Sequence, residues 1–176
     1  MKTLYIERST GECRNGEWVS KLDLDGVERI VVGTGPGSFA GIRSALAFAQ
    51  GYSIGTGCEV LGMPSACALA KESGLLAVVG DARRDKFWVA LFDGMRLLKP
   101  IFQTMADDLA VQVPEDARVV TPDEERIGLK LGEIFGARYI GGEKPAPEGL
   151  ERFAEANPSI LEKEPLPIYL NPAVRP

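Results

Sequence analysis

Apolar residues in the first half of the chain come in short runs separated by glycine-rich or polar turns. Residues 29–32 form a β-branched run that enters a glycine cluster, and Ser38 then opens a long segment that ends near Gly55. This order predicts a strand, a loop and a helix. Residues 3–19 are short, polar and interrupted by glycine, which favours one or two small strands with tight turns.

The middle of the chain predicts a second helix and a hairpin. Pro64 suits the first turn of a helix, and Gly74 suits the left-handed position that ends one. Residues 75–79 and 87–92 are continuous apolar runs, as strands covered on both faces are. We therefore expect a hairpin over residues 75–92 in the middle of a sheet.

The second half of the chain has weaker patterns. Thr121-Pro122-Asp123-Glu124 has the pattern of a capping box, and it precedes one apolar stripe at helical spacing. Residues 143–148 indicate a linker, residues 150–156 a short helix, and the proline-rich end from Pro158 an extended tail. The stripe consists of Ile127, Leu131, Ile134 and Phe135.

The alternation of strands and helices is typical of a layered α/β fold. We expect a main lobe over residues 1–95 and a smaller lobe, with the proline-rich tail, over residues 96–176.

Composition and charge limit the classes of function. With 45% hydrophobic and 26% charged residues the chain is globular, which excludes disordered and collagen-like classes. The net charge is −5, so the bulk surface repels polyanions and we do not expect direct nucleic-acid binding. The beginning of the chain is too polar for a signal segment, and no apolar run approaches the ~18 residues of a membrane span. The sequence predicts a cytoplasmic protein without a membrane partner.

The residue types available for chemistry are few. The chain has no histidine, which excludes histidine-based metal sites and triads, and we expect neither a metal nor a cofactor. Cys13, Cys58 and Cys67 are widely spaced, which fits a reducing compartment, and the last two read as small buried hydrophobic residues. Trp18 and Trp88 read as core or rim packing.

The glycine loop that begins at Gly33 has three interpretations. The glycines could serve only a tight turn or a close backbone approach. They could instead bind a phosphate at a helix N-terminus, although the loop lacks the Lys-Ser/Thr pair of a Walker A loop and the spacing of a dinucleotide fingerprint. Finally, Gly41, Ala45 and Ala49 recur every four residues and make a smooth helix face on which another helix, of the same chain or another, could pack.

Three segments resemble the TsaB (YeaZ) family. Residues 33–55, GTGPGSFAGIRSALAFAQGYSIG, are similar to its G-x-GPGSFTG-x-R…AQGLA-x-G segment. Residues 79–88, with Asp81 and Arg83, resemble the DAR hairpin of the family, and residues 167–170, with Tyr169, resemble its C-terminal P-x-YLR. In the first segment the matching positions are Gly35, Pro36, Gly37, Ser38, Phe39, Gly41, Arg43, Ala49, Gln50 and Gly51.

The resemblance implies an actin-like, ribonuclease H-like α/β fold: a mixed sheet with flanking helices and a reduced second lobe. It implies a subunit without catalytic residues that supports TsaD in threonylcarbamoyl modification of the adenosine next to the tRNA anticodon. The ATPase TsaE would be a further partner, and a homodimer is possible. In the family the glycine loop and the following helix lie at the dimer surface, so the expected partner-binding residues are Gly35, Pro36, Gly37, Ser38, Phe39, Gly41, Arg43, Ala45 and Ala49.

The sequence departs from the family pattern at its start. About ten residues separate Ser20 from Ile30, too few for a strand, a helix and a connection, so a helix of the family's dimer surface is missing. Arg8-Ser9-Thr10 replaces the acidic phosphate-loop pattern, Ala40 replaces a threonine, and Asn171 replaces an arginine.

Two other functions remain open. The chain could be a trimmed actin-like nucleotide-binding protein or phosphotransferase that uses the glycine loop, or a stand-alone homodimerisation module. Asp81, Arg83 and Asp85 could form an acid/base site, but polar residues at a turn more often form a local ion pair.

Overall fold

The structure is a computed structural model that describes residues 1–11 and 18–170. The chain divides into two compact units. Unit 1 comprises Met1–Ala68 and Ala146–Ile168, and unit 2 comprises Leu69–Pro145 and Tyr169–Pro176. The expected boundary at residue 95 lies inside unit 2, because the strands of the predicted hairpin pair with a strand later in the chain.

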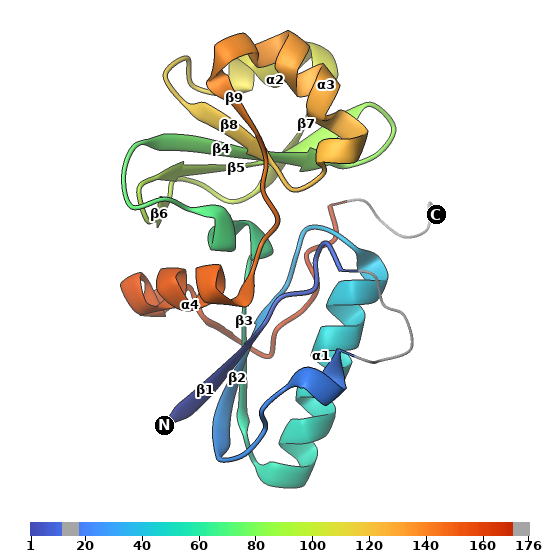
Figure 1. Ribbon diagram of the computed structural model, residues 1–176, viewed down its shortest axis with the longest axis vertical. Helices are drawn as coiled ribbons and strands as arrows, with labels where there is room; N and C mark the ends of the chain where they lie inside the picture. Colours follow the sequence, from blue (N-terminus) through green and yellow to red (C-terminus); the bar gives the residue numbers. More distant parts are fainter. Residues whose placement is uncertain (12–17, 171–176) are drawn as a thin grey trace. The chain divides into compact units, whose positions relative to one another are not determined.

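Unit 1 is built on a four-stranded sheet (Figure 1). Its strand order is β1-β2-β3-β10, with β1 parallel to β2, β2 parallel to β3, and β10 antiparallel to β3. The β-branched residues of β2 are buried on both faces of this sheet, which confirms the strand predicted there. The strands are β1 (Lys2–Ile6), β2 (Val27–Gly33), β3 (Glu59–Met63) and β10 (Glu162–Lys163).

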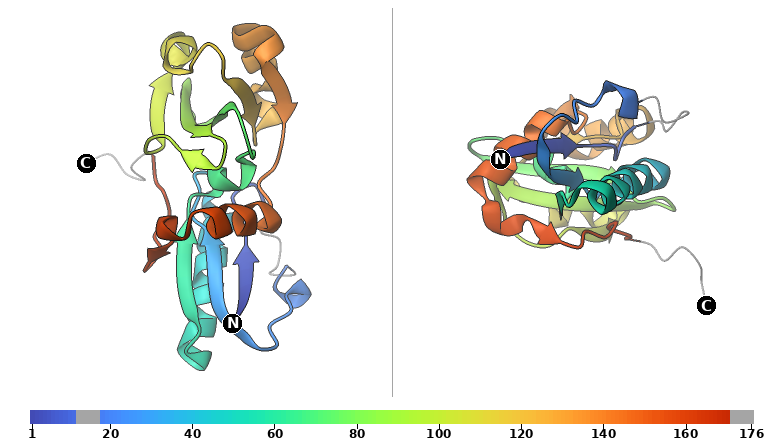
Figure 2. Two further views of the ribbon diagram at one scale, coloured as in Figure 1. Left: turned by 90° about the vertical axis from the view of Figure 1, so that its left-hand side faces the viewer. Right: turned by 90° about the horizontal axis from the view of Figure 1, so that it is seen from below.

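Helices cover both faces of the unit 1 sheet. Helix α1 (Phe39–Thr56) packs Ile42 and Leu46 against Ile30 and Val32 on one face. Helix α4 (Pro147–Ala156) lies over the other face, as Figures 1 and 2 show. Burial raises the pKa of Tyr5 in β1, and carboxylates of α4 raise it further.

The connection from β1 to β2 contains no α-helix in its described part, only the 3-10 turn η1 (Val19–Lys21). Trp18 packs edge-on against Phe48 of α1, with ring centroids 5.4 Å apart. The hydroxyl of Tyr52 donates to the carbonyl oxygen of Leu24 at 3.0 Å. The described part of the connection therefore lies along one flank of α1. The turn expected at Gly16 lies outside the described residues.

The helix predicted over residues 64–74 is wrong in length. The structure has a 3-10 helix, η2 (Ser65–Leu69), after Pro64. The polar residues Glu72 and Ser73 are exposed, so no apolar stripe continues the helix. Gly74 has a left-handed φ of +85° as predicted, but it forms the turn into the next strand.

Unit 2 is built on a six-stranded sheet of order β6-β5-β4-β8-β9, with β7 also paired to β5. Strands β4 and β5 form an antiparallel hairpin, and β4 pairs on its other side with β8. The predicted hairpin in the middle of the sheet is confirmed. The strands are β4 (Leu75–Asp81), β5 (Lys86–Asp93), β6 (Arg96–Leu97), β7 (Phe102–Met105), β8 (Arg118–Thr121) and β9 (Tyr139–Gly142).

Helices α2 (Ala106–Gln112) and α3 (Glu124–Phe135) pack on one face of this sheet (Figure 1). The predicted stripe on α3 is confirmed, because Ile127, Leu131 and Phe135 are buried in the unit 2 core. The capping box is wrong: the N-cap is Asp123, and the Thr121 hydroxyl accepts a hydrogen bond from the Asp123 N–H at 3.1 Å. The 3-10 turn η3 (Gly136–Arg138) follows α3.

The last segments return to unit 1. The linker predicted over residues 143–148 is shorter in the structure, because α4 already begins at Pro147. The extended tail predicted from Pro158 instead starts with the 3-10 helix η4 (Pro158–Ile160) and continues into β10. Within the described residues, no helix is both long enough and apolar enough to span a bilayer.

Candidate functional site

The glycine loop joins β2 to α1 over residues 33–38. Ser38 is the N-cap of α1, and its hydroxyl accepts a hydrogen bond from the Gly41 N–H at 3.2 Å. This bond satisfies one of the free N–H groups of the first helical turn. The strand, loop and helix predicted from the sequence are confirmed.

The loop uses its main-chain donors within unit 1. The Gly35 N–H donates to the Ser65 hydroxyl at 2.9 Å, and the Ser65 N–H donates back to the Gly35 carbonyl at 2.8 Å. The Ser38 N–H donates to the Ser9 carbonyl, and the Thr34 N–H to the Met63 carbonyl at 2.9 Å. The N–H groups of Thr34, Gly35 and Ser38 are therefore occupied by protein acceptors and do not face a ligand as in a phosphate cradle.

Close backbone contacts explain two of the glycines. A Cβ on Gly37 would lie 2.4 Å from the Ser9 carbonyl oxygen, and a Cβ on Gly41 would lie 2.0 Å from the Arg8 carbonyl oxygen. Both distances are far below van der Waals contact. Of the three interpretations of the loop, the structure therefore favours close approach to the end of β1.

The small-residue face of α1 is directed into its own unit. Gly41, Ala45 and Ala49 are buried, and both alanines belong to the core between α1 and the sheet. Their expected role in partner contact is therefore corrected: small residues let α1 lie close to β1 and β2 of the same chain. Spacing alone does not distinguish an internal neighbour from a partner.

The outer face of α1 is exposed and is largely apolar. Phe39 is 51% exposed and Ile54 is 88% exposed, at opposite ends of the helix. The Arg43 guanidinium lies 4.8 Å from the Phe39 ring centroid, a cation–π contact. The outer face, as the term is used below, consists of Phe39, Ala40, Arg43, Ala47, Gln50, Gly51 and Ile54.

Some residues of the glycine loop are buried in unit 1, and others are exposed beside the outer face of α1. Gly35 and Pro36 are buried, Gly37 is exposed and Ser38 is half-buried. Only part of the predicted partner-binding set is thus accessible: Gly37, Ser38, Phe39 and Arg43.

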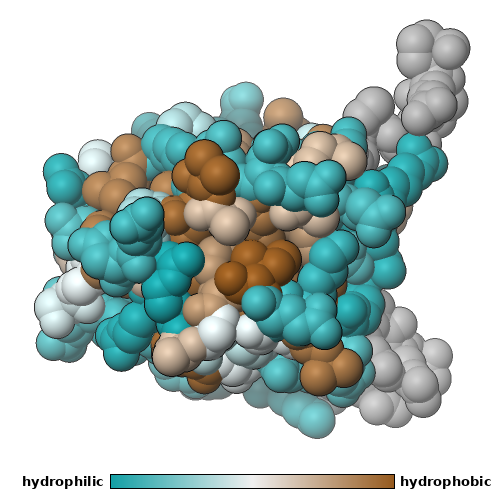
Figure 3. All heavy atoms as spheres, turned by 90° about the horizontal axis from the view of Figure 1, so that it is seen from above, coloured by the Kyte–Doolittle hydropathy of each residue, from teal (hydrophilic) through white to brown (hydrophobic). Residues whose placement is uncertain are grey.

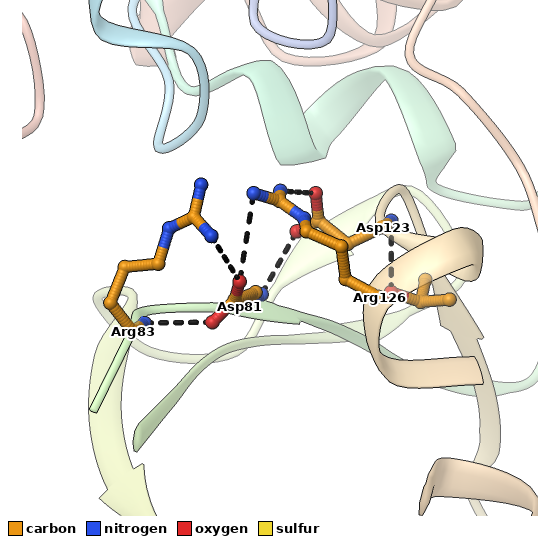
Figure 4. A network of polar contacts seen from close by, with 5 residues as sticks. Asp81, Arg83, Asp123 and Arg126 are labelled. Carbon is orange, nitrogen blue, oxygen red and sulfur yellow. Dashed lines mark hydrogen bonds and ion pairs between the residues drawn. The ribbon is translucent and has the colours of Figure 1, made fainter. Parts of the chain in front are cut away.

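The second family motif forms an ion-pair network in unit 2 (Figure 4). Arg83 and Arg126 approach the same Asp81 carboxylate oxygen, at 3.3 and 3.6 Å. The Asp81 N–H donates to the Asp123 carboxylate at 2.9 Å, and Arg126 also pairs with Asp123. The expected local ion pair at the turn is confirmed, whereas sequence patterns gave no signal for Asp123 and Arg126 as its partners.

The turn beside this network has an unusual backbone. Arg83, Arg84 and Asp85 have φ values of 65°, 56° and 58°, all in the left-handed region. The Arg83 N–H donates to the Asp81 carboxylate at 2.7 Å, and the Lys86 N–H donates to the Arg83 carbonyl at 3.2 Å. Asp81 thus stabilises a turn that non-glycine residues rarely form.

The third motif begins beside the glycine loop. The Ile168 N–H donates to the Thr34 carbonyl at 2.8 Å. Tyr169, the next residue, is 53% exposed.

The remaining candidates for chemistry are buried. Burial raises the pKa of the Cys58 thiol and, more strongly, that of Cys67, so neither is a reactive thiolate. Trp88 is buried and its indole ring lies over Gly80, where a Cβ would overlap it. Cys13 lies outside the described residues. No three Cys, Asp or Glu side chains gather into a possible metal site in the described ranges.

Comparison with protein families gives one match over more than half of the chain. Residues 19–126 match the family described as TsaD, tRNA N6-adenosine threonylcarbamoyltransferase. This range includes the glycine loop, α1 and the β4–β5 hairpin.

Relatives of similar sequence occur in mycobacteria. Uncharacterized proteins of Mycobacterium tuberculosis (strain H37Rv) and Mycobacterium bovis are 31% identical over 151 residues, which are 85% of this chain. An uncharacterized protein of Mycobacterium leprae is 32% identical over 148 residues. The chain spans 66% of the length of the first two relatives and 39% of the third.

Two solved structures from Pseudomonas aeruginosa share the fold. YeaZ superposes with a TM-score of 0.71 at 22% identity, and a protein described as similar to peptidase YeaZ superposes with 0.70 at 20%. Each match covers 96% of this chain and 99% of the other. The expected actin-like α/β fold is confirmed. The sequence match shows that the chain belongs to the TsaD family, and the superpositions show that it has the fold of the YeaZ structures.

Proposed function

We propose that this chain is a TsaB-like subunit that binds a TsaD-type catalytic partner and supports threonylcarbamoyl modification of tRNA. The match of residues 19–126 to the family described as tRNA N6-adenosine threonylcarbamoyltransferase supports the proposal. The mycobacterial relatives are longer than this chain, so the activity and partners of the whole protein are part of the proposal.

The outer face of α1 is the observation that carries the proposal. A helix that is apolar on one side packs that side on its own sheet and exposes a polar side to water. Helix α1 already buries Ile42, Ala45 and Leu46 against its sheet, yet it exposes Phe39, Ala47 and Ile54 on the other side. A second protein surface would remove these apolar groups from water.

One flank of α1 is covered by residues of the chain itself, which leaves the outer face of this helix for contact with a partner. Trp18, Phe48 and Tyr52 pack together along one side of α1. That flank is filled by the chain itself. The partner surface is thus the outer face with the exposed part of the glycine loop, Gly37 and Ser38.

The absence of a catalytic role is also part of the proposal. The Gly35 and Ser38 N–H groups of the loop bind acceptors of the chain, which leaves them unavailable to a nucleotide phosphate. The carboxylates of Asp81 and Asp123 are engaged with Arg83, Arg126 and main-chain N–H groups. Neither arrangement offers a base or a nucleophile beside an open site.

The test is calorimetric titration of the cognate TsaD-type protein with the wild-type chain and two arginine variants. Ala47→Arg places a charge in the outer face, and Leu129→Arg places one on α3 at a side chain that is 91% exposed. We expect Ala47→Arg to weaken binding by about 2 kcal/mol or more, as a charge at an interface centre does. Leu129→Arg is expected to bind like the wild type.

The same preparations separate the alternatives. Heat on titration with ATP and magnesium would favour the nucleotide-binding protein. A dimer of the chain alone, together with no association with TsaD at micromolar concentration, would favour the homodimerisation module. In a strain that lacks its TsaB, the wild-type chain should restore tRNA modification and Ala47→Arg should not. TsaE is proposed as a further member of the complex, and its addition to the TsaD mixture tests this.

A further inference from the structure

The C-terminal segment over residues 162–168, here called the strap, returns from α4 to the edge of the unit 1 sheet. Strand β10 pairs antiparallel with β3 through Glu162 opposite Gly62 and Lys163 opposite Leu61. Strand β3 would otherwise be an edge strand on this side, since β10 is the last strand of the sheet. The strap therefore covers main-chain groups that an open edge exposes.

Besides its pairing with β3, the strap makes a close side-chain contact at Gly62. Pro165 is buried, and a Cβ on Gly62 would lie 2.4 Å from the Pro165 Cβ and 2.7 Å from the Thr34 Cγ2. Gly62, Pro165 and Thr34 thus meet at one point, where only glycine leaves enough room. The strap contacts the beginning of the glycine loop through this point.

The strap is also held by a main-chain hydrogen bond to the glycine loop. The Ile168 N–H donates to the Thr34 carbonyl at 2.8 Å, and the Thr34 N–H donates to the Met63 carbonyl at 2.9 Å. Thr34 is only 2% exposed, so both of its main-chain groups are bonded in a buried position. Gly35, the next residue, is fixed from another direction by Ser65. The strap and Ser65 together hold the loop residues that lead to Ser38 and α1.

The strap itself has few buried contacts. Glu162, Lys163 and Glu164 are exposed, and Leu166 is 74% exposed. Among residues 162–168, Pro165 is the one that is buried. Segments with little buried apolar surface open locally at lower free energy than the core they cover. The strap can therefore open while the sheet and α1 stay folded.

We infer that the strap is a positioning element for the partner surface: when it is closed it fixes the glycine loop and the start of α1 for docking. The part of this inference that concerns docking rests on the proposed function, because it is tested by binding of the TsaD-type partner. Because a partner that prefers the closed strap stabilises it, bound partner must in turn lower the equilibrium constant for strap opening by the factor by which opening weakens binding.

Two variants of the full chain open the strap by different routes. Ile168→Pro removes the N–H that binds Thr34, and Gly62→Ala introduces a Cβ where Pro165 lies. Their controls are Leu166→Ala, at an exposed side chain of the strap, and Gly132→Ala, whose Cβ would meet only Tyr139 at 3.8 Å. Circular dichroism verifies that each variant is folded.

Hydrogen exchange read by mass spectrometry measures the strap directly. We expect amide exchange over residues 34–38 and 61–63 to accelerate roughly tenfold or more in Ile168→Pro and Gly62→Ala, with both controls unchanged. Unchanged loop exchange in either folded strap variant overturns the inference. This measurement needs no partner, so it is independent of the proposed function.

Titration with the TsaD-type partner then tests the coupling. Roughly tenfold weaker binding of both strap variants, and protection of residues 162–168 in the wild-type complex, support the inference. Equal affinity of the strap variants and the wild type contradicts it. If the wild type itself does not bind, the proposed function fails and the positioning role for docking fails with it, while the exchange result still decides whether the strap fixes the loop.

Discussion

Glu7 is a buried carboxyl at the end of β1, beneath the glycine loop. Its Oε1 accepts a hydrogen bond from the Ser9 N–H, and a Cβ on Gly33 would overlap its carboxylate. Burial raises the pKa of Glu7 above the ordinary value of 4.5, although hydrogen bonds from Ser9 and Ser65 and the charge of Arg8 oppose the rise. The folded state therefore retains this proton to higher pH than the unfolded state does.

The sign of the resulting pH dependence follows from linkage. At pH below the unfolded pKa, both states are protonated and the stabilising contribution is fully present. As pH rises through the folded pKa, that contribution is lost, because the folded state must then bury a charge. Stability from this group thus falls toward alkaline pH.

Glu7→Gln tests this expectation, because the amide resembles the protonated acid. In urea unfolding at pH 8, we expect the free energy of unfolding of Glu7→Gln to exceed that of the wild type. At pH 4 the difference should shrink. Glu133→Gln, at an exposed position of α3, is the control and should change neither value. A wild type more stable than Glu7→Gln at pH 8 would contradict the raised pKa.

Two glycines of α1 give opposite predictions for the same substitution. Gly41→Ala should lower the free energy of unfolding by more than about 2 kcal/mol, because the Cβ would meet the Arg8 carbonyl at 2.0 Å. Gly51→Ala should raise it by about 0.5–1 kcal/mol, since its Cβ meets nothing within 4 Å and alanine favours a helix. Thermal unfolding of both variants measures the contrast, and equal effects would place α1 differently on its sheet.

Some features of helix α1 can be predicted from its sequence, and others cannot. The N-cap at Ser38 and an end near Gly57 follow from local chemistry, and the sequence predicted the helix closely. The sequence does not determine which face of α1 packs inside. One face carries small residues and the other carries alanines and large apolar residues, and either face could be buried. The tertiary neighbours Arg8 and Ile30 decide it.

The other differences also come from tertiary contacts. The segment after Pro64 forms only the short 3-10 helix η2, although Gly74 has the left-handed backbone typical of a helix end. Sequence patterns predicted the Asp81 turn but not Asp123, which is 42 residues away along the chain and bonds the Asp81 N–H. Partners so distant leave no local signal.

Asp123 offers a stability test for unit 2. Asp123→Ala should lower the free energy of unfolding by about 1–3 kcal/mol, because the Asp81 N–H and Arg126 lose their acceptor. Arg83→Ala should change it by less than about 1 kcal/mol, because that guanidinium is largely exposed and solvent screens its ion pair. Urea unfolding followed by tryptophan fluorescence compares the two, and an equal or larger effect of Arg83→Ala would contradict the network described.

At the scale of the whole molecule, unit 1 is assembled from two distant segments of the chain. Its first segment supplies three strands and α1, and its second supplies α4 and the strap. Leu150 and Phe153 of α4 are fully buried, so the first segment is incomplete without residues 146–168.

Phe153→Ala tests this dependence. It should lower the free energy of unfolding by about 3–5 kcal/mol, as truncation of a buried phenylalanine does. Phe39→Ala, which truncates an exposed phenylalanine of the outer face, should lower it by less than about 1 kcal/mol. Calorimetric unfolding of the full chain measures both, and a small effect of Phe153→Ala would show that α4 is not part of the unit 1 core.

Exposed apolar residues of unit 2 provide a comparison for the proposed docking surface on α1. Val111 of α2 and Leu129 of α3 are strongly exposed, and Figure 3 shows hydrophobic residues bordered by hydrophilic ones on the side of these helices. Exposure of single apolar residues is common on soluble proteins. The two faces share this exposure, and the proposed docking surface is the one that continues from α1 into Gly37 and Ser38 of the glycine loop.

A photo-cross-linking residue placed at Ile54 or at Leu129 compares the two faces directly. Both side chains are about equally exposed, at 88% and 91%. In the presence of the TsaD-type partner, we predict a cross-linked heterodimer from position 54 and none from position 129. Cross-linking from position 129 alone would contradict the assignment of the outer face of α1 as the docking surface.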